Sequence, residues 1–152
     1  MIGLLWAVSV VAEIGWFFWQ GRWMPRLSLG AWLVLCSVAT VARMGLTAGA
    51  AAALPVLLLA QLVHALTFAA HHAACIALLS QHFPGRLRGR GQALFMVVGY
   101  GLPGVLGGLL GGALSARFGL QSVFWACTGI SVAAAACAFR VWRGQRRHGV
   151  TG

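Results

Sequence analysis

Three ionisable residues, Glu13, Arg43 and His64, stand inside three successive apolar stretches of the sequence. A charged side chain at the centre of a bilayer costs about 2.5–3.5 kcal/mol on insertion scales, so each is a functional candidate. Burial favours a neutral carboxyl group whereas a neighbouring arginine favours the ionised form, and a proton-coupled site can use that competition. Arginine keeps its proton and needs a counter-ion, an anionic substrate or water. The three residues therefore predict a substrate or proton site.

Two structural alternatives stay open for these residues. Glu13 and Arg43 would also suit an ion pair that only holds two helices together, and His64 would suit a hydrogen bond to a neighbouring helix. Gln61 precedes His64 by one helical turn and is a further candidate polar group of the same site.

His71 is expected to face this site too. His64, Phe68, His71 and Cys75 follow one another at helical spacings of three and four residues, which places them on one face. His71 and His72 point about 100° apart, so at most one of them faces the site. We predict no metal site and no cofactor, because a closed zinc site needs four ligands and only His71 and Cys75 are clearly placed.

The composition excludes water as the main solvent of this chain. Hydrophobic residues make up 61% of the 152 residues and charged residues 8%, whereas soluble domains carry roughly 25% charged residues. The net charge of +10 does not indicate nucleic-acid binding, because the arginines lie between long apolar stretches and not on a solvated face. No nucleotide loop, nucleophile elbow or HExxH motif occurs, and one acidic residue cannot form a carboxylate pair, so we do not expect an enzyme.

The pattern predicts an all-α membrane protein, because a spanning helix needs roughly 20 apolar residues. About five transmembrane helices are expected, at about 2–20, 29–49, 53–80, 92–115 and 120–139. They form a transmembrane region over 1–142, followed by a basic cytoplasmic tail over 143–152. Pro55 suits the first turn of the third helix, and Gly119 suits the turn before the fifth.

The arginines predict the orientation. Most of them fall at one end of the predicted helices: Arg22, Arg26, Arg86, Arg88, Arg90, Arg140, Arg143, Arg146 and Arg147. By the positive-inside rule this end is cytoplasmic, which puts the N-terminus outside and the C-terminus inside. We therefore expect a multi-pass protein of a cell membrane, such as a bacterial inner membrane, in contact with the lipid bilayer.

The fourth stretch carries a strip of glycines at four-residue spacing. They are Gly104, Gly107, Gly108, Gly111 and Gly112. Small residues at this spacing let helices approach closely in a membrane. Close helix packing is the main interpretation, and a flexing helix that assists alternating access is the alternative. Pro103 is expected to kink this helix, because it lacks a backbone donor.

The segment from Gly107 to Trp125 resembles the last helix–loop–helix of major facilitator superfamily transporters, with a glycine-rich helix 11 and an aromatic pair opening helix 12. Leu5–Glu13 is similar to helix 8 of the phenylpropionate-permease-like branch, which is related to lactose permease. Gln61–Phe68 is similar to helix 10, and Arg90–Leu94 to the start of helix 11. The resemblance implies a partial major facilitator fold, the C-terminal part with helices 8 to 12.

The resemblance also implies a function. The chain would be part of a secondary active transporter, a symporter that moves a small organic solute, such as an aromatic carboxylate, by alternating access with proton coupling. Glu13, Arg43 and His64 would bind substrate or relay protons, and the missing N-terminal helices of the same transporter would be its partner. The second carboxylate that lactose permease carries on helix 10 is not present. The loop 21–26 has no Asp, which leaves the usual gating contact of the superfamily in doubt.

Two other functions remain as alternatives. The small multidrug resistance exporters also carry a lone glutamate in their first helix, but they have four helices in a shorter chain. A structural membrane module without transport activity is the second alternative.

Overall fold

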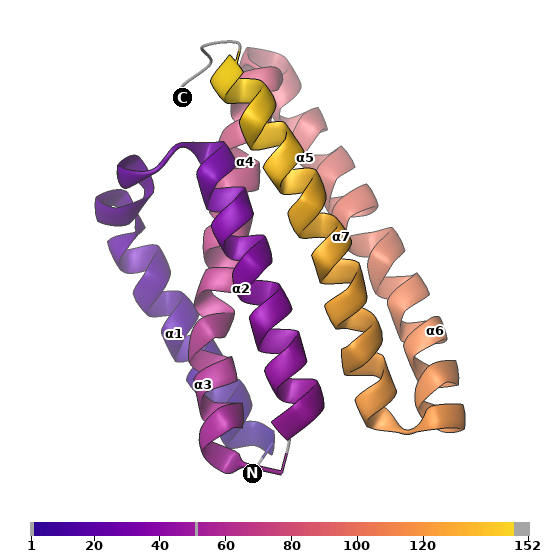
Figure 1. Ribbon diagram of the computed structural model, residues 1–152. Helices are drawn as coiled ribbons and strands as arrows, with labels where there is room; N and C mark the ends of the chain where they lie inside the picture. Colours follow the sequence, from indigo (N-terminus) through magenta and orange to yellow (C-terminus); the bar gives the residue numbers. More distant parts are fainter. Residues whose placement is uncertain (1, 51, 148–152) are drawn as a thin grey trace.

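The computed structural model describes residues 2–50 and 52–147, and every regular element among them is helical (Figure 1). The elements are α1 (Ile2–Trp23), η1 (Met24–Arg26), α2 (Leu29–Ala50), α3 (Leu54–His64), η2 (Ala65–Ala70), α4 (His71–His82), η3 (Gly85–Leu87), α5 (Arg88–Met96), η4 (Val97–Gly101), α6 (Leu102–Phe118) and α7 (Leu120–Arg147). Two of the short elements, η1 and η3, are 3₁₀ turns, whereas η2 and η4 are π-helical turns inside longer helices.

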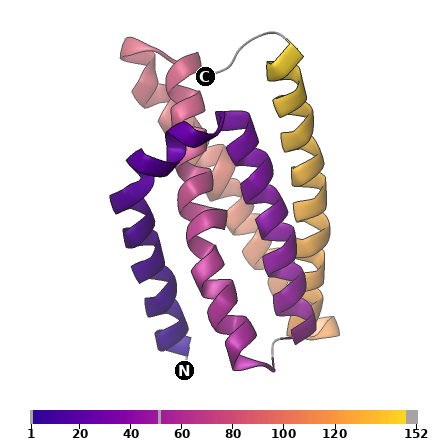
Figure 2. The ribbon, with the colours of Figure 1, turned by 60° about the vertical axis from the view of Figure 1, so that its left-hand side comes forward.

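Within the described residues, five continuous helices are long and apolar enough to cross a membrane, which confirms the predicted fold class. They are Gly3–Arg26, Leu29–Ala50, Leu54–His82, Gly85–Phe118 and Leu120–Arg147. Successive helices run in opposite directions, and α1 begins at the end of the bundle opposite to the one where α7 stops (Figures 1 and 2). The turns rich in arginine therefore gather at one end, as the charge pattern predicted.

The helices extend beyond the predicted boundaries where arginines follow the apolar stretch. Helix α5 begins at Arg88, before the predicted start at 92, and α7 continues to Arg147. Hydropathy marks the part that lies in lipid, but arginine has a high helix propensity and does not end a helix. Residues 143–147 of the predicted tail are thus helical, and 148–152 lie outside the described residues.

Proline and glycine begin and end helices as predicted. Pro55 occupies the first turn of α3, where its missing N–H removes no hydrogen bond. Gly119 adopts a φ of +79°, a conformation that glycine reaches without steric cost, and it reverses the chain between α6 and α7. A π-helical turn, η4, ends at Gly101, two residues before Pro103.

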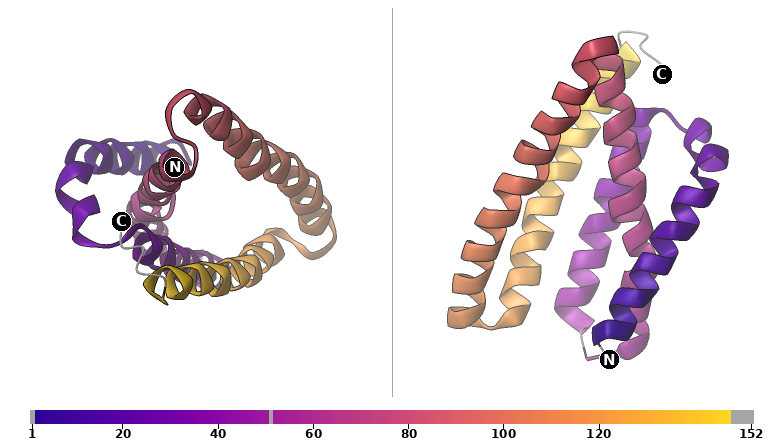
Figure 3. Two further views of the ribbon diagram at one scale, coloured as in Figure 1. Left: turned by 90° about the horizontal axis from the view of Figure 1, so that it is seen from above. Right: turned by 180° about the vertical axis from the view of Figure 1, so that it is seen from behind.

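The most extensive helix pairing joins α2 and α7, which lie side by side (Figure 3). Gly30 makes the close approach possible, because a Cβ atom there would lie 3.2 Å from the backbone of Trp142. On its other side α2 buries Trp32 and Cys36 against Ala70 and Ala74. Helix α1 packs on α3 and η2, so α1, α2 and the α3–η2–α4 helix form one group.

Helix α6 continues directly from η4, packs on α7 and is otherwise exposed. Within the described part of the chain, most of the predicted glycine strip does not pack against another helix. No described atom lies within 4 Å of a Cβ built at Gly104, Gly107, Gly108 or Gly112, and only Gly111 contacts α7, at 3.6 Å from Val123. Apolar surface of this kind suits lipid or another helix.

Candidate substrate-binding site

One cavity of about 520 Å³ brings four of the predicted site residues together. Its lining consists of Leu5, Trp6, Ser9, Val10, Glu13, Arg43, Gln61, His64 and Phe68. The residues from α1 recur at spacings of three and four, so one face of that helix forms a wall of the cavity. Helix α2 supplies Arg43, and the α3–η2 helix supplies the rest.

Glu13 pairs with His64 inside this cavity. His64 Nε2 lies 2.9 Å from Glu13 Oε1, and the two side chains are 25% and 20% exposed. The other ring nitrogen of His64, Nδ1, is buried and has no hydrogen-bond partner among the described residues. The ring stacks on Phe68 with a centroid distance of 5.4 Å and an interplanar angle of 12°. The imidazole is thus fixed in orientation with one nitrogen unused.

Arg43 is held by neutral groups. Its Nε donates to the backbone carbonyl of Ala60 at 2.9 Å, and Nη1 donates to the hydroxyl of Thr67 at 3.4 Å. Within the described residues no carboxylate lies within 4.0 Å of the guanidinium, since Glu13 pairs with His64 instead. The alternative of a direct Glu13–Arg43 ion pair is therefore not what this structure forms. The guanidinium presents its positive charge to the cavity.

The structure does not bring His71 into this cavity. The π-helical turn η2 lies between His64 and His71, and a π turn contains an additional residue, which rotates all later side chains by about 100°. His71 instead lines a second cavity, of about 230 Å³, with residues of α2 and α7. Its ring nitrogens lie 3.8 Å from Cys75 Sγ. No group of three or more potential metal ligands occurs in the described ranges.

The same turn creates an aromatic cluster that the sequence analysis missed. Phe68 stacks between His64 and His72, and His72 Nδ1 lies 3.1 Å from the hydroxyl of Tyr100 on η4. Phe95 completes the cluster on α5. The spacing of four between 64, 68 and 72 was visible in the sequence, but nothing there indicated the partner on the fourth span. This cluster joins the two π-helical turns.

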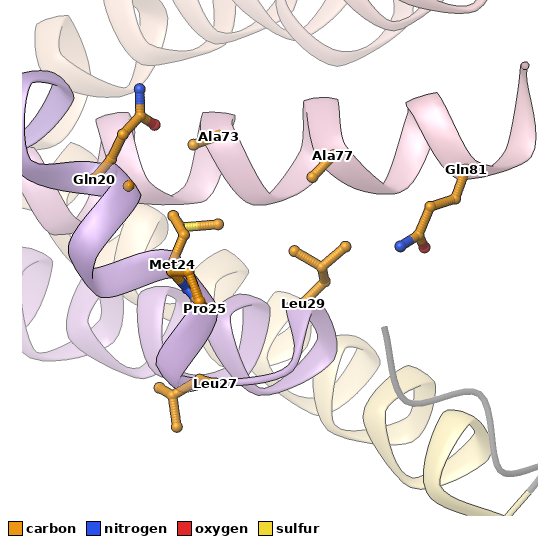
Figure 4. A pocket seen from close by; sticks show the side chains of 9 residues that line it. Gln20, Met24, Pro25, Leu27, Leu29, Ala73, Ala77 and Gln81 are labelled. Carbon is orange, nitrogen blue, oxygen red and sulfur yellow. The ribbon is translucent and has the colours of Figure 1, made fainter.

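A larger cavity, of about 630 Å³, lies at the end of α1, away from these ionisable residues (Figure 4). Its described lining is apolar apart from the amides of Gln20 and Gln81, which come from α1 and α4. Its described lining contains no charged residue, whereas the smaller cavity is lined by Glu13, Arg43 and His64. The smaller cavity is therefore the candidate site.

The comparisons with known proteins agree with this architecture. The model of the MFS_1 like family matches residues 1–126, which include all of the residues that line the Glu13 cavity. No curated protein and no solved structure matches at a significant level. The matched range covers most of the chain, and the chain therefore belongs to the MFS_1 like family, within the major facilitator superfamily.

Proposed function

We propose that this chain is part of a secondary active transporter that moves a small organic anion, such as an aromatic carboxylate, by alternating access. Membership of the MFS_1 like family supports a transporter-type function. The observation that carries the choice of an anion is the guanidinium of Arg43, which opens on the cavity without a carboxylate within 4.0 Å among the described residues. An anionic substrate supplies the missing counter-charge.

The shape of the cavity supports an organic substrate with an apolar body. Its volume of about 520 Å³ falls within the range of ligand pockets, roughly 300–1,000 Å³. Trp6, Phe68, Leu5 and Val10 provide apolar and aromatic surface beside the charged groups. The aromatic ring of such a substrate would contact these side chains. Its carboxylate would bind Arg43, and a polar substituent on the ring would bind Gln61.

Proton coupling is proposed at the Glu13–His64 pair. The pair has a short contact of 2.9 Å and lies beside the proposed anion site, so a proton gained or lost there alters the field on the substrate. The unpartnered Nδ1 of His64 offers a second position for a proton. Symport is the corresponding mode of transport.

We propose that further transmembrane helices close over the exposed side of this cavity during transport. Trp6, on the cavity wall, is 71% exposed, and alternating access places the substrate between two groups of helices. We propose that the N-terminal helices of the same transporter supply the second group. The arginine-rich end is proposed to face the cytoplasm of a bacterial cell, with the start of α1 outside.

A charge series tests the substrate class. The chain is placed in lipid nanodiscs and titrated with benzoate, benzamide and benzylamine, which share a ring and differ in charge, with tryptophan fluorescence as the readout. We expect benzoate to bind at least about tenfold more tightly than the other two, because only benzoate neutralises Arg43. Equal binding of all three, or a preference for the amine, rejects an anion site.

A further inference from the structure

A second polar cavity lies between three helices, next to the proposed anion site. Its volume is about 230 Å³, and its lining residues are Ser37, Thr40, Thr67, His71, Ser131 and Ala134. They come from α2, from the η2–α4 helix and from α7. Four hydroxyl groups and an imidazole thus surround one space between three helices.

Every hydroxyl group in this cavity donates its hydrogen bond to a backbone carbonyl of its own helix. Ser37 Oγ donates to the carbonyl of Leu33 at 2.7 Å, and Thr40 Oγ1 donates to that of Cys36 at 2.8 Å. Ser131 and Thr67 likewise donate to carbonyls of their own helices, at 2.7 and 3.2 Å. A hydroxyl group has one donor and two lone pairs. All four oxygens therefore present only lone pairs to the cavity.

A lining made of acceptors favours a positively charged occupant and disfavours an anion. We propose that this cavity holds a second coupling cation, in addition to the proton proposed at the Glu13–His64 pair, either as a proton on His71 or as a sodium ion among the hydroxyl oxygens. A protonated imidazole has two N–H donors and no acceptor, so it complements these oxygens in the same way as a sodium ion does. The inference rests on the proposed transport function, because it names a further ion that the substrate is coupled to.

The ionisable groups around His71 are few. On its own helix they are Cys75, with Sγ 3.8 Å from the ring, and the neighbouring His72. Helix α2 contributes Arg43, through Thr67, and the thiol of Cys36, which is buried against Ala70 and Ala74. Helix α7 contributes no charged residue to the described lining. Glu13, on α1, faces His64 in the other cavity. Arg43 is thus the nearest permanent charge that a hydrogen bond connects to this cavity, through Thr67. Its positive charge repels a cation in the cavity.

Thr67 connects the two cavities. Its hydroxyl accepts a hydrogen bond from Arg43 Nη1 at 3.4 Å and also lines the second cavity. A cation in contact with this oxygen would lie about 6 Å from the guanidinium, where repulsion at an effective dielectric of 20 weakens binding roughly 100-fold. An anion on Arg43 cancels most of that repulsion. Anion and cation therefore strengthen each other's binding by the same factor.

Benzoate binding to the chain in nanodiscs tests this linkage. The dissociation constant is measured at about pH 6 and about pH 8 without sodium, and then at the higher pH with sodium chloride against choline chloride. We expect one of the two cations to tighten benzoate binding by at least about tenfold, within the bound set by the repulsion. Benzoate stays ionised throughout, since its carboxyl group titrates near pH 4.

Variants separate the two forms of the cation. If it is a proton, His71→Gln abolishes the pH dependence that remains after Glu13 and His64 are both replaced by Gln. If it is sodium, Thr40→Val and Ser131→Ala weaken the sodium effect and His71→Gln leaves it. Thr128→Val is the matched control, because Thr128 makes the same 2.8 Å bond to a carbonyl four residues earlier and does not line the cavity. Benzoate binding that ignores both cations, or a cation effect that survives these substitutions, overturns the inference. Absence of benzoate binding rejects the proposed function as well.

Discussion

Neutralising Glu13 is expected to tighten anion binding. Glu13 and Arg43 line the same cavity, and the carboxylate pairs with His64. An anion that binds to the guanidinium must therefore approach the carboxylate as well. Glu13→Gln removes this negative charge but keeps a side-chain oxygen that can accept the hydrogen bond from His64 Nε2. The substitution thus changes the field in the cavity with little change in shape.

The size of the effect follows from Coulomb's law. Two carboxylates about 7 Å apart at an effective dielectric of 20 repel by about 2.4 kcal/mol, which corresponds to roughly 50-fold in affinity. The cavity is partly open, so salt and water screen this value. We expect Glu13→Gln to lower the dissociation constant of benzoate by about 5- to 50-fold.

Radiolabelled benzoate binding in nanodiscs measures this change, and Gln61→Glu serves as the opposite control. Gln61 lines the same cavity, so a carboxylate at this position should weaken benzoate binding by a similar factor. Weaker binding in Glu13→Gln, or no change in either variant, would show that the bound anion lies away from these side chains and would refute the reasoning.

Three further outcomes are expected. Gly30→Ala should lower the melting temperature in detergent and the free energy of unfolding by about 1–3 kcal/mol, because its Cβ would clash with the Gln145 side chain and lie 3.1 Å from the Trp142 ring. Gly49→Ala should not, because no described atom beyond its chain neighbours and its own helix backbone lies within 4 Å of a Cβ there; equal melting of both would contradict the α2–α7 contact. Tyr100→Phe should lower the free energy of unfolding by about 1 kcal/mol, because the hydrogen bond to His72 is lost. It should leave benzoate affinity unchanged, since neither residue lines the Glu13 cavity. A green fluorescent protein fused after residue 152 should fluoresce and an alkaline phosphatase fused there should be inactive, and the reverse pair of results would overturn the orientation.

The number and approximate positions of the spans could be predicted from the sequence, because the thickness of a bilayer sets the length of an apolar helix. The ends of the helices could not. Arg88 and Arg147 lie inside helices, since hydropathy reports the surroundings of a residue and not its backbone conformation.

The site was predictable to the extent that it follows regular helix geometry. Glu13, Arg43 and His64 were named because they are costly in lipid, and the structure places all three on one cavity. Their pairing was not predictable, because the sequence does not say whether the carboxylate of Glu13 contacts Arg43 or His64. His71 lies elsewhere because a π-helical turn precedes it, and the sequence offers no signal for that extra residue.

The most direct test of an anion site is benzoate binding to Arg43→Gln beside Arg117→Gln, both in nanodiscs. Arg43 lines the cavity, and its hydrogen-bond partners are neutral groups. Arg117 lies in the last turn of α6 and does not line the cavity. A charged hydrogen bond contributes about 1.5–3 kcal/mol, so Arg43→Gln should weaken benzoate binding roughly 10- to 150-fold. Arg117→Gln should bind as the unaltered chain does. Equal affinity in the two variants would contradict the account, because the charge that selects the substrate would then lie elsewhere.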